Sequence, residues 1–385
     1  MHGDRGQVPL SIYVHLPWCV RKCPYCDFNS HAVDGVVDQS GYVDALLRDL
    51  DRESMRKPLP ALRSIFIGGG TPSLFDGAAI ARLIAGIERR VPLVDGIEIT
   101  LEANPGTAEA ARFAAYRAAG VNRLSIGVQS LDDARLVALG RIHSAGEAVA
   151  AFEMARAAGF DNINLDMMYG LPHQSAAQAI SDLRALIALG PEHLSWYQLT
   201  LEPNTLFHHR PPAGLPDDDG LGDIMDAGQA LLADAGFAQY EISAYARDGR
   251  ECRHNRNYWE FGDYLGIGAG AHGKLTLADR VVERTTKPRN PGDYLAGAGR
   301  ADGGTVHKVS SEELPLEFML NALRLNLGVP KALFEPRTGL PVRKIEAQIR
   351  RARARGLLCD APERLQPTPL GQRFLNDLLA IFEPR

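Results

Sequence analysis

The sequence predicts an α/β fold, namely a partial (β/α)6 barrel with a small added sheet and a helical, winged-helix-like C-terminal domain. Three observations lead to this prediction. Short apolar strands alternate with helix-like segments over the first two thirds of the chain, which is typical of a parallel sheet with right-handed crossovers. Polar and glycine-rich residues follow directly after each strand. Helical patterns return after about residue 310.

The predicted strands are short runs rich in β-branched and aromatic residues. They cover residues 11–16, 64–70, 97–105, 123–130, 162–172 and 193–199. Apolar residues at helical spacing predict the intervening helices over residues 40–57, 76–90, 107–119, 146–158 and 175–189. The carboxyl ends of barrel strands carry the active site, so the polar residues there predict one site built from six loops. A flat doubly wound sheet would more often concentrate function at one switch point.

After about residue 237, the regular alternation of strand-like and helix-like segments ends. Residues 237–246, 272–277 and 280–285 are β-like and predict the added sheet, whereas the glycine-rich stretch 262–273 predicts a loop. Helical patterns over 313–326, 341–355 and 369–382 flank short extended segments, as in a winged-helix module. We therefore expect two domains, the barrel with its added β segment at 1–290 and the helical domain at 310–385.

Composition narrows the classes of function. The chain has 385 residues, of which 45% are hydrophobic and 23% charged, and this is ordinary globular composition. A net charge of −5 argues against a general polyanion binder, so we expect no nucleic acid partner. There is no apolar run of about 18 residues and no signal pattern at the N-terminus. We expect a cytoplasmic protein without a transmembrane segment, for which peripheral contact with a membrane stays open.

Three of the five cysteines form a cluster. Cys19, Cys23 and Cys26 follow the first strand with the spacing C-x3-C-x2-C. Three thiolates can bind three irons of a [4Fe–4S] cluster and leave the fourth iron open to a further ligand. The alternative is a structural zinc site that recruits His31. Zinc sites usually add a second, distant cysteine pair, which this chain lacks.

The motifs together resemble a known family. C-x3-C-x2-C with Tyr25 before its last cysteine resembles the radical S-adenosylmethionine (SAM) superfamily, in which SAM binds the open iron. YVHLPWC, GGGTPS, EANPG, SIGVQS, GRIHS and DMMYGLP resemble its oxygen-independent coproporphyrinogen oxidase-like group. The true oxidases typically have a further cysteine where this chain has Phe28. HNRNYW at 254–259 fits the HemW branch of haem chaperones.

The resemblance implies a haem chaperone that binds haem and a SAM-ligated [4Fe–4S] cluster and delivers haem to client haemoproteins. The alternative is a coproporphyrinogen III oxidase that performs radical oxidative decarboxylation, a reaction that the HemW branch is thought not to perform. A third, weaker idea is a DNA-binding regulator that senses iron–sulfur status through the winged-helix-like tail.

The resemblance also assigns cofactor contacts at successive strand ends. A carboxylate can accept hydrogen bonds from ribose hydroxyls or an ammonium group, an arginine fork suits a carboxylate, and glycines allow close backbone approach. Taken singly, each of the polar residues is more simply a solvated or structurally paired side chain, whereas a plain tight turn would explain one glycine of the motif but not three. The SAM candidates are Tyr13, Tyr25, Gly69, Gly70, Thr71, Glu102, Gln129, Arg141 and Asp166.

The HNRNYW motif predicts a haem contact. His254 is the candidate axial ligand and nearby Cys252 a second one, while Tyr258 and Trp259 could stack on the porphyrin. The alternative is a structural loop whose histidine caps a strand. The basic segment 343–355 is most simply a solvated helix face, although it could dock haem propionates or an acidic client.

Overall fold

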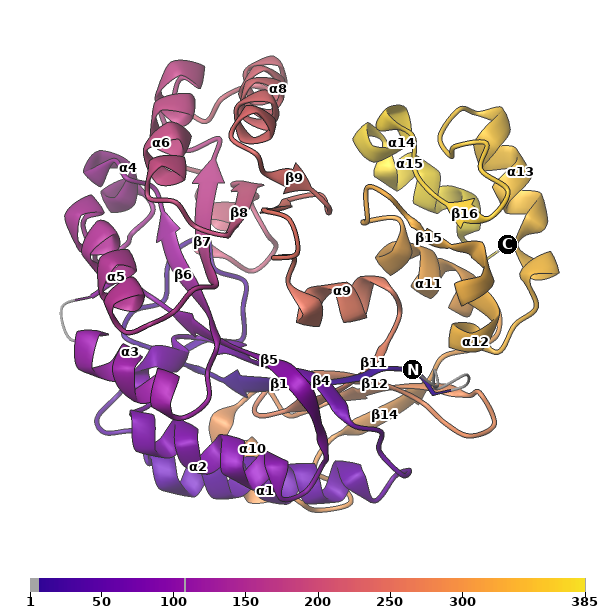
Figure 1. The fold of residues 1–385 in the computed structure, drawn as a ribbon, viewed down its shortest axis with the longest axis horizontal. Helices are drawn as coiled ribbons and strands as arrows, with labels where there is room; N and C mark the ends of the chain where they lie inside the picture. The colour runs from indigo at the N-terminus through magenta and orange to yellow at the C-terminus, as the bar shows by residue number, and fades with distance from the viewer. Residues whose placement is uncertain (1–6, 107–108, 385) are drawn as a thin grey trace.

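The described part of the chain, residues 7–106 and 109–384, builds one large mixed sheet in the computed structural model (Figure 1). The strands of the chain are β1 (Leu10–Leu16), β2 (Trp18–Cys19), β3 (His31–Ala32), β4 (Leu62–Gly69), β5 (Leu93–Ala103), β6 (Arg123–Gln129), β7 (Ile163–Tyr169), β8 (His193–Gln198), β9 (Ala238–Gln239), β10 (Ala244–Ala246), β11 (Asp263–Ile267), β12 (His272–Thr276), β13 (Val282–Thr286), β14 (Thr305–Lys308), β15 (Val329–Pro330) and β16 (Arg364–Leu365).

The helices cover the outer side of this sheet and build the C-terminal region. They are α1 (Gln39–Ser54), α2 (Gly77–Glu88), α3 (Glu109–Ala118), α4 (Asp133–Ala138), α5 (Ala145–Ala157), α6 (Ala176–Ala188), α7 (Leu206–His209), α8 (Asp218–Asp234), α9 (Arg253–Trp259), α10 (Pro291–Gly297), α11 (Leu314–Ala322), α12 (Phe334–Thr338), α13 (Glu346–Ala354), α14 (Pro369–Arg373) and α15 (Leu375–Leu379). The predicted helix at 107–119 corresponds to α3, and its first two residues lie outside the described part of the chain.

The main sheet has the strand order β14-β13-β12-β11-β1-β4-β5-β6-β7-β8-β10-β9. The six predicted strands are β1, β4, β5, β6, β7 and β8, and they pair in parallel. The sheet is curved and its edges are β9 and β14, which agrees with a partial barrel. The predicted added β segments are present, but they extend the same sheet at both edges.

The prediction of a loop over 262–273 was wrong, because this stretch contains β11. This strand pairs in parallel with β1, so that Ser11 lies opposite Tyr264 and Val14 opposite Ile267. Its glycines serve close packing. A Cβ on Gly266 would lie 1.9 Å from the carbonyl oxygen of His272, and Gly268 has φ +109°. A glycine inside a strand often marks such a close approach of another backbone.

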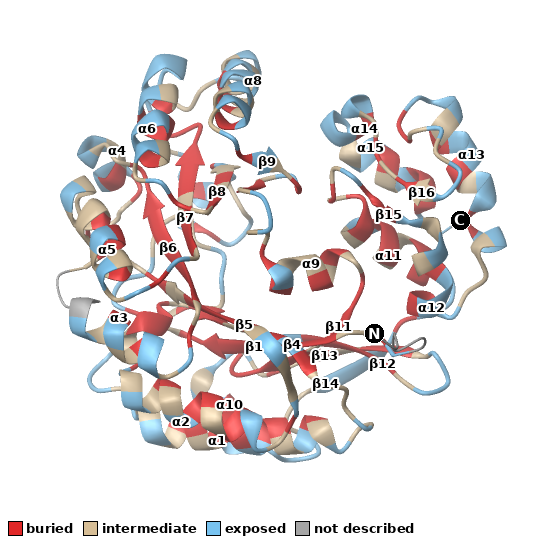
Figure 2. Cartoon of the chain, viewed as in Figure 1, coloured by how far each residue is buried: buried red, intermediate tan, exposed pale blue. Residues whose placement is uncertain are grey.

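The two faces of the sheet differ in chemistry. On β1, Ile12 and Val14 belong to the apolar core beneath the outer helices, whereas Tyr13 points to the inner side, where it stacks on Phe66. This follows from the alternation of side chains along a strand. Helix α9 lies on the inner side of the sheet, between the strands and the C-terminal helices, and Figure 2 shows how deeply the strands are buried.

The C-terminal helices share a second apolar core with the end of α9. Phe318 on α11 contacts Phe334 on α12 and also Phe261, which follows α9. The predicted helix at 341–355 begins as a 3-10 turn at 342–344 and continues as α13, and the one at 369–382 divides into α14, α15 and a final turn. A two-stranded pair, β15 with β16, completes the winged-helix-like arrangement. The domain limits at 290 and 310 stay a prediction.

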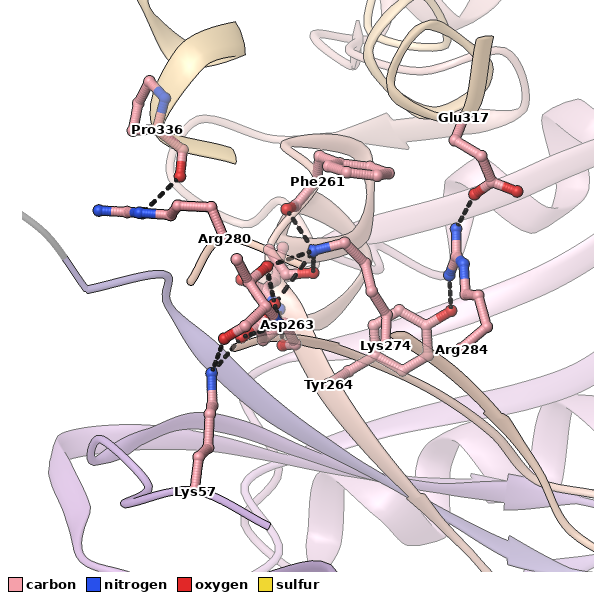
Figure 3. A network of polar contacts seen from close by, with 12 residues as sticks. Lys57, Phe261, Asp263, Tyr264, Lys274, Arg280, Arg284, Glu317 and Pro336 are labelled. Carbon is pink, nitrogen blue, oxygen red and sulfur yellow. Dashed lines mark hydrogen bonds and ion pairs between the residues drawn. The ribbon is translucent and has the colours of Figure 1, made fainter. Parts of the chain in front are cut away.

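Polar contacts, some of them buried, join the start of β11 to neighbouring segments and the sheet to these helices (Figure 3). Asp263 at the start of β11 is fully buried and forms ion pairs with Lys57 (2.6 Å) and Lys274 (3.0 Å). Arg280 donates to the carbonyl of Pro336 (2.8 Å), and Arg284 on β13 is ion-paired with Glu317 on α11.

None of the described helices combines the length and apolarity needed to cross a bilayer.

Candidate functional site

A cavity of about 610 Å³ opens at the carboxyl ends of the parallel strands. It is bordered by residues from six successive strand ends, as expected for a site in this architecture. Of the thirteen residues singled out from the sequence, the lining brings together Cys19, Cys23, Tyr25, Cys26, Gly69, Gly70, Thr71, Glu102, Gln129, Arg141 and Asp166. Tyr13 and His254 lie outside this lining.

The cysteine loop is shaped by main-chain contacts at its base. β2 pairs in parallel with β3, so that Cys19 lies opposite Ala32 and the loop leaves and returns at one place. Within the loop, the N–H of Cys26 donates to the carbonyl of Cys23 (3.1 Å), and Cys26 Sγ lies 3.6 Å from Ser30 Oγ. Cys19 is buried, whereas Cys23 and Cys26 are partly exposed at the cavity.

The donor set fits an iron–sulfur cluster better than a single metal ion. Among the described residues, no three His, Cys, Asp or Glu side chains converge closely enough to hold one ion. His31, the candidate fourth zinc ligand, has its Nε2 3.2 Å from the carbonyl of Arg289. A cluster spreads its three thiolates over three iron atoms and does not require such convergence.

The glycines after β4 are required by the cysteine loop itself. A Cβ on Gly70 would lie 2.4 Å from the carbonyl oxygen of Trp18. The N–H groups of Gly70 and Thr71 donate to the carbonyls of Leu16 (2.8 Å) and Trp18 (2.7 Å). Gly69 has φ +123°, which a residue with a side chain rarely adopts. The motif therefore packs the β4 loop against the chain that enters the cysteine loop.

Arg141 contacts three of the segments that border the cavity. Its Nη2 donates to Asn104 Oδ1 (2.7 Å) and to the carbonyl of Gly127 (2.8 Å), while its Nη1 lies 3.8 Å from Cys23 Sγ. Asn104 in turn donates to Thr71 Oγ1 (2.8 Å). The buried Nε of Arg141 has no hydrogen-bond partner. A buried donor of this kind needs an acceptor, and a carboxylate of a bound ligand would supply one.

Two half-buried carboxylates face the same cavity. Glu102 accepts from the N–H of Gly69 (3.0 Å), and burial, together with the nearby Asp166 carboxylate, raises the pKa of Glu102 to about 8. Asp166 accepts from Ser125 Oγ (3.0 Å) and Asn164 Nδ2 (2.8 Å), and burial raises its pKa as well. Two such carboxylates in one pocket suit a ligand that brings a cation or several hydroxyl groups.

Aromatic and amide side chains complete the wall. Gln129 ends β6 with φ +69°, and its Oε1 accepts from the hydroxyl of Tyr197 (2.7 Å). Tyr25 packs with Phe207 in a small apolar cluster beside Met168. Met168 on β7 and Tyr197 on β8 therefore add apolar area to a lining that is otherwise largely polar.

Tyr13 acts beside the cavity. Its hydroxyl lies 3.0 Å from His15 Nδ1, and His15 Nε2 lies 2.9 Å from the carbonyl of Asn29. Because a carbonyl can only accept, His15 carries its proton on Nε2 and accepts from Tyr13 at Nδ1. This chain of contacts positions the residues that follow Cys26.

His254 is buried on the inner side of the sheet. Its Nδ1 lies 2.9 Å from Ser64 Oγ and its Nε2 lies 2.7 Å from the hydroxyl of Tyr258, so both ring nitrogens are occupied. Burial, with a smaller contribution from Arg123, lowers the pKa of His254 to about 3, and the imidazole is neutral. Its backbone N–H donates to Glu98 (3.1 Å) at the start of α9. Haem ligation by His254 stays a prediction.

Sequence reasoning singled out neither Ser243 nor Arg324, which also line the cavity. Both come from outside the βα loops, and no local motif marks them. Tyr197 was missed as well, although its position at the end of the sixth predicted strand was a usable signal.

The comparisons with known proteins agree with this geometry. Residues 13–186 match the Radical SAM superfamily, and residues 309–374 match the HemN C-terminal domain. The heme chaperone HemW of Escherichia coli (strain K12) is 51% identical over 374 residues, which cover 97% of this chain and 98% of that protein. The HemW protein of Haemophilus influenzae is 49% identical over 378 residues, with the same coverage of both chains.

Two further comparisons extend the range. The mitochondrial radical S-adenosyl methionine domain-containing protein 1 of Mus musculus is 37% identical and covers 97% of this chain and 87% of that protein. The structure of coproporphyrinogen III oxidase (HemN) from Escherichia coli superimposes with a TM-score of 0.81 at 23% identity, covering 98% of this chain and 90% of that one, and this shows the fold. The prediction from the sequence motifs is confirmed: the chain belongs to the HemW family of the radical SAM superfamily.

Proposed function

We propose that the chain is a haem chaperone, which binds haem and a SAM-ligated [4Fe–4S] cluster and delivers haem to client haemoproteins. The observation that carries this proposal is 51% identity over nearly the full length to a protein named heme chaperone HemW. The cavity supports it, because the three cysteines share one pocket with buried groups suited to SAM. Phe28, the residue at the position of the further oxidase cysteine, is 60% exposed.

Different side chains of the cavity would bind the cluster and the parts of SAM. Cys19, Cys23 and Cys26 would hold the cluster, which when bound supplies the electron that cleaves the sulfonium of SAM. Arg141 would offer its unpartnered Nε to the SAM carboxylate. Glu102 and Asp166 would accept hydrogen bonds from the ammonium group and the ribose hydroxyls.

Haem binding and transfer can be measured on one preparation. The full-length chain is reconstituted anaerobically with iron and sulfide, titrated with haemin, and then mixed with an apo-haemoprotein. We expect a shifted Soret band on binding and the spectrum of the acceptor after mixing. A preparation that carries the cluster and leaves the haemin spectrum unchanged would contradict the proposal.

The same preparation separates the chaperone from the oxidase. It is incubated anaerobically with coproporphyrinogen III, SAM and a reductant. We expect no protoporphyrinogen. Sustained turnover would show that the chain is an oxidase, a question that fold similarity at 23% identity leaves open.

A further inference from the structure

The cavity extends beyond the residues that would hold SAM. On the side of β8 its lining includes the polar residues Gln198, Thr200 and Glu202, and it also includes Ser243 and Arg324. Ser243 lies against β8, because its carbonyl accepts from the N–H of Trp196 (2.8 Å). A volume of about 610 Å³ lies within the usual range of cofactor-sized sites, about 300–1,000 Å³.

The backbone of Arg324 is fixed by a contact between distant segments. Arg324 follows α11, and its neighbour Leu325 forms an antiparallel bridge with Glu241, between β9 and β10. The next residue, Asn326, donates its N–H to the carbonyl of Tyr240 (3.0 Å). The C-terminal region therefore presents this arginine to the cavity from a defined position.

The guanidinium of Arg324 is oriented as well. It is ion-paired with Glu241, a carboxylate that is 1% exposed, while Arg324 itself is 39% exposed. The other oxygen of Glu241 accepts from the N–H of Ser243 (2.9 Å). Arginine carries five N–H donors, so a guanidinium paired on one nitrogen retains donors for a second carboxylate. Glu241 Oε1 has no hydrogen-bond partner among the described residues, so the ion pair leaves the N–H donors of Arg324 available.

The other cations of the lining are placed differently. Arg21 and Lys22 belong to the cysteine loop, and Arg141 is engaged with Asn104 and Cys23. Among the described lining residues, Arg324 is the basic side chain that comes from the C-terminal region. Met168 and Tyr197 give the same lining apolar area.

We propose that Arg324 binds a carboxylate of the cargo, namely a propionate of haem, at the end of the cavity formed by β8 and β10. This inference rests on the proposed function, and it names the group through which the cargo is recognised. A porphyrin brings a flat apolar ring for the β7–β8 wall and carboxylates for the arginine. Glu241 already compensates part of the positive charge, so the anchor mainly orients the cargo. We expect its loss to weaken binding about tenfold, which is the lower end for a charge-assisted hydrogen bond.

The test compares two ligands on the cluster-reconstituted full-length chain. Haemin and haemin dimethyl ester, which lacks both carboxylates, are titrated in the same detergent solution. The wild type should bind haemin about tenfold more tightly than the ester. Arg324→Gln should bind both with the affinity that the wild type has for the ester. Equal wild-type affinities for the two ligands, or an undiminished preference for haemin in Arg324→Gln, would overturn the proposal and leave haem binding itself intact.

Two further variants control for structural damage. Arg324→Gln leaves the buried Glu241 without its counter-charge, so the double variant Glu241→Gln/Arg324→Gln is measured in parallel. Arg373→Gln removes a similar ion pair between α14 and Asp226 (2.6 Å), with both side chains 58% exposed, and Arg373 is not among the cavity residues. The double variant should lose the preference for haemin and Arg373→Gln should keep it. Loss of the preference in Arg373→Gln would refute a specific role of Arg324.

Discussion

If Glu102 binds the ammonium group of SAM, as proposed above, SAM binding should depend on pH, and the size of the effect follows from the pKa of Glu102. Burial and the nearby Asp166 raise the pKa of Glu102 to about 8. At pH 7 only about one molecule in ten then carries the ionised carboxylate. An ammonium group of SAM binds the ionised form, so the apparent affinity at pH 7 should be about tenfold, or about 1.4 kcal/mol, below its value at high pH.

The variant Glu102→Gln isolates this effect. A glutamine oxygen can still accept from the N–H of Gly69, so the local contact is retained. The dissociation constant of SAM is measured by calorimetry from pH 6 to pH 9 on the reconstituted wild type and variant. SAM titrates identically in both experiments, so the ratio of the two constants reports on Glu102.

We expect the wild type to gain affinity relative to Glu102→Gln, by about ninefold from pH 6 to pH 7, about fivefold from pH 7 to pH 8 and less than about twofold from pH 8 to pH 9. The direction follows because a raised carboxyl pKa keeps the group protonated at neutral pH. Parallel pH profiles for the two proteins would refute the reasoning, because they would show that Glu102 stays in one charge state when SAM binds.

The remaining predictions concern stability, the cluster and haem. Asp263→Asn leaves Lys274 buried without an acid and should lower the free energy of unfolding by about 3–5 kcal/mol. Lys274→Met should lower it by only about 1–2 kcal/mol, because Lys57 still pairs with Asp263. Equal losses of the two variants in urea unfolding would contradict this expectation. Replacing all three loop cysteines by alanine should abolish the iron–sulfur spectrum and keep the circular dichroism of the fold; a surviving cluster spectrum would exclude this loop as its site. If His254 binds haem iron, Tyr258→Phe frees Nε2 of His254 and should tighten haemin binding. His254→Ala should then remove the Soret shift. Haemin titrations that both variants leave unchanged would exclude His254 as the iron ligand.

The barrel strands could be predicted because their signal is local. Each is a short apolar run, and buried parallel strands need little else. Helix α8 was missed, although Asp217 caps it and two acidic residues occupy its first turn. Its glycines argue against a helix, yet a Cβ on Gly228 would lie 1.9 Å from the ring of Trp196. The tertiary packing that demands this glycine cannot be read from the helix itself.

In the cavity too, the residues in local motifs could be predicted from the sequence, whereas those placed by long-range contacts could not. The cysteine loop follows the first predicted strand, and Glu102 and Asp166 lie on the third and the fifth, so the strand order alone predicts that they meet at one end of the sheet. Arg324 reaches the cavity only because the bridge between Leu325 and Glu241 joins two distant parts of the chain. A single sequence does not reveal such a contact, since neither segment has a strong strand pattern.

The HNRNYW motif connects two parts of the molecule, which limits how it can bind haem. From α9, His254 reaches Ser64 on β4, while Trp259 belongs to the core of the C-terminal helices. Glu98 on β5 accepts from the first backbone N–H groups of the helix, those of Arg253 and His254. Iron could reach Nε2 only if the hydroxyl of Tyr258 left it. A propionate at Arg324 requires no such rearrangement, because this side chain already lines the cavity. Cargo recognition through Arg324 can therefore precede any ligation by His254, and the haemin titrations of the Arg324 and His254 variants measure the two steps separately.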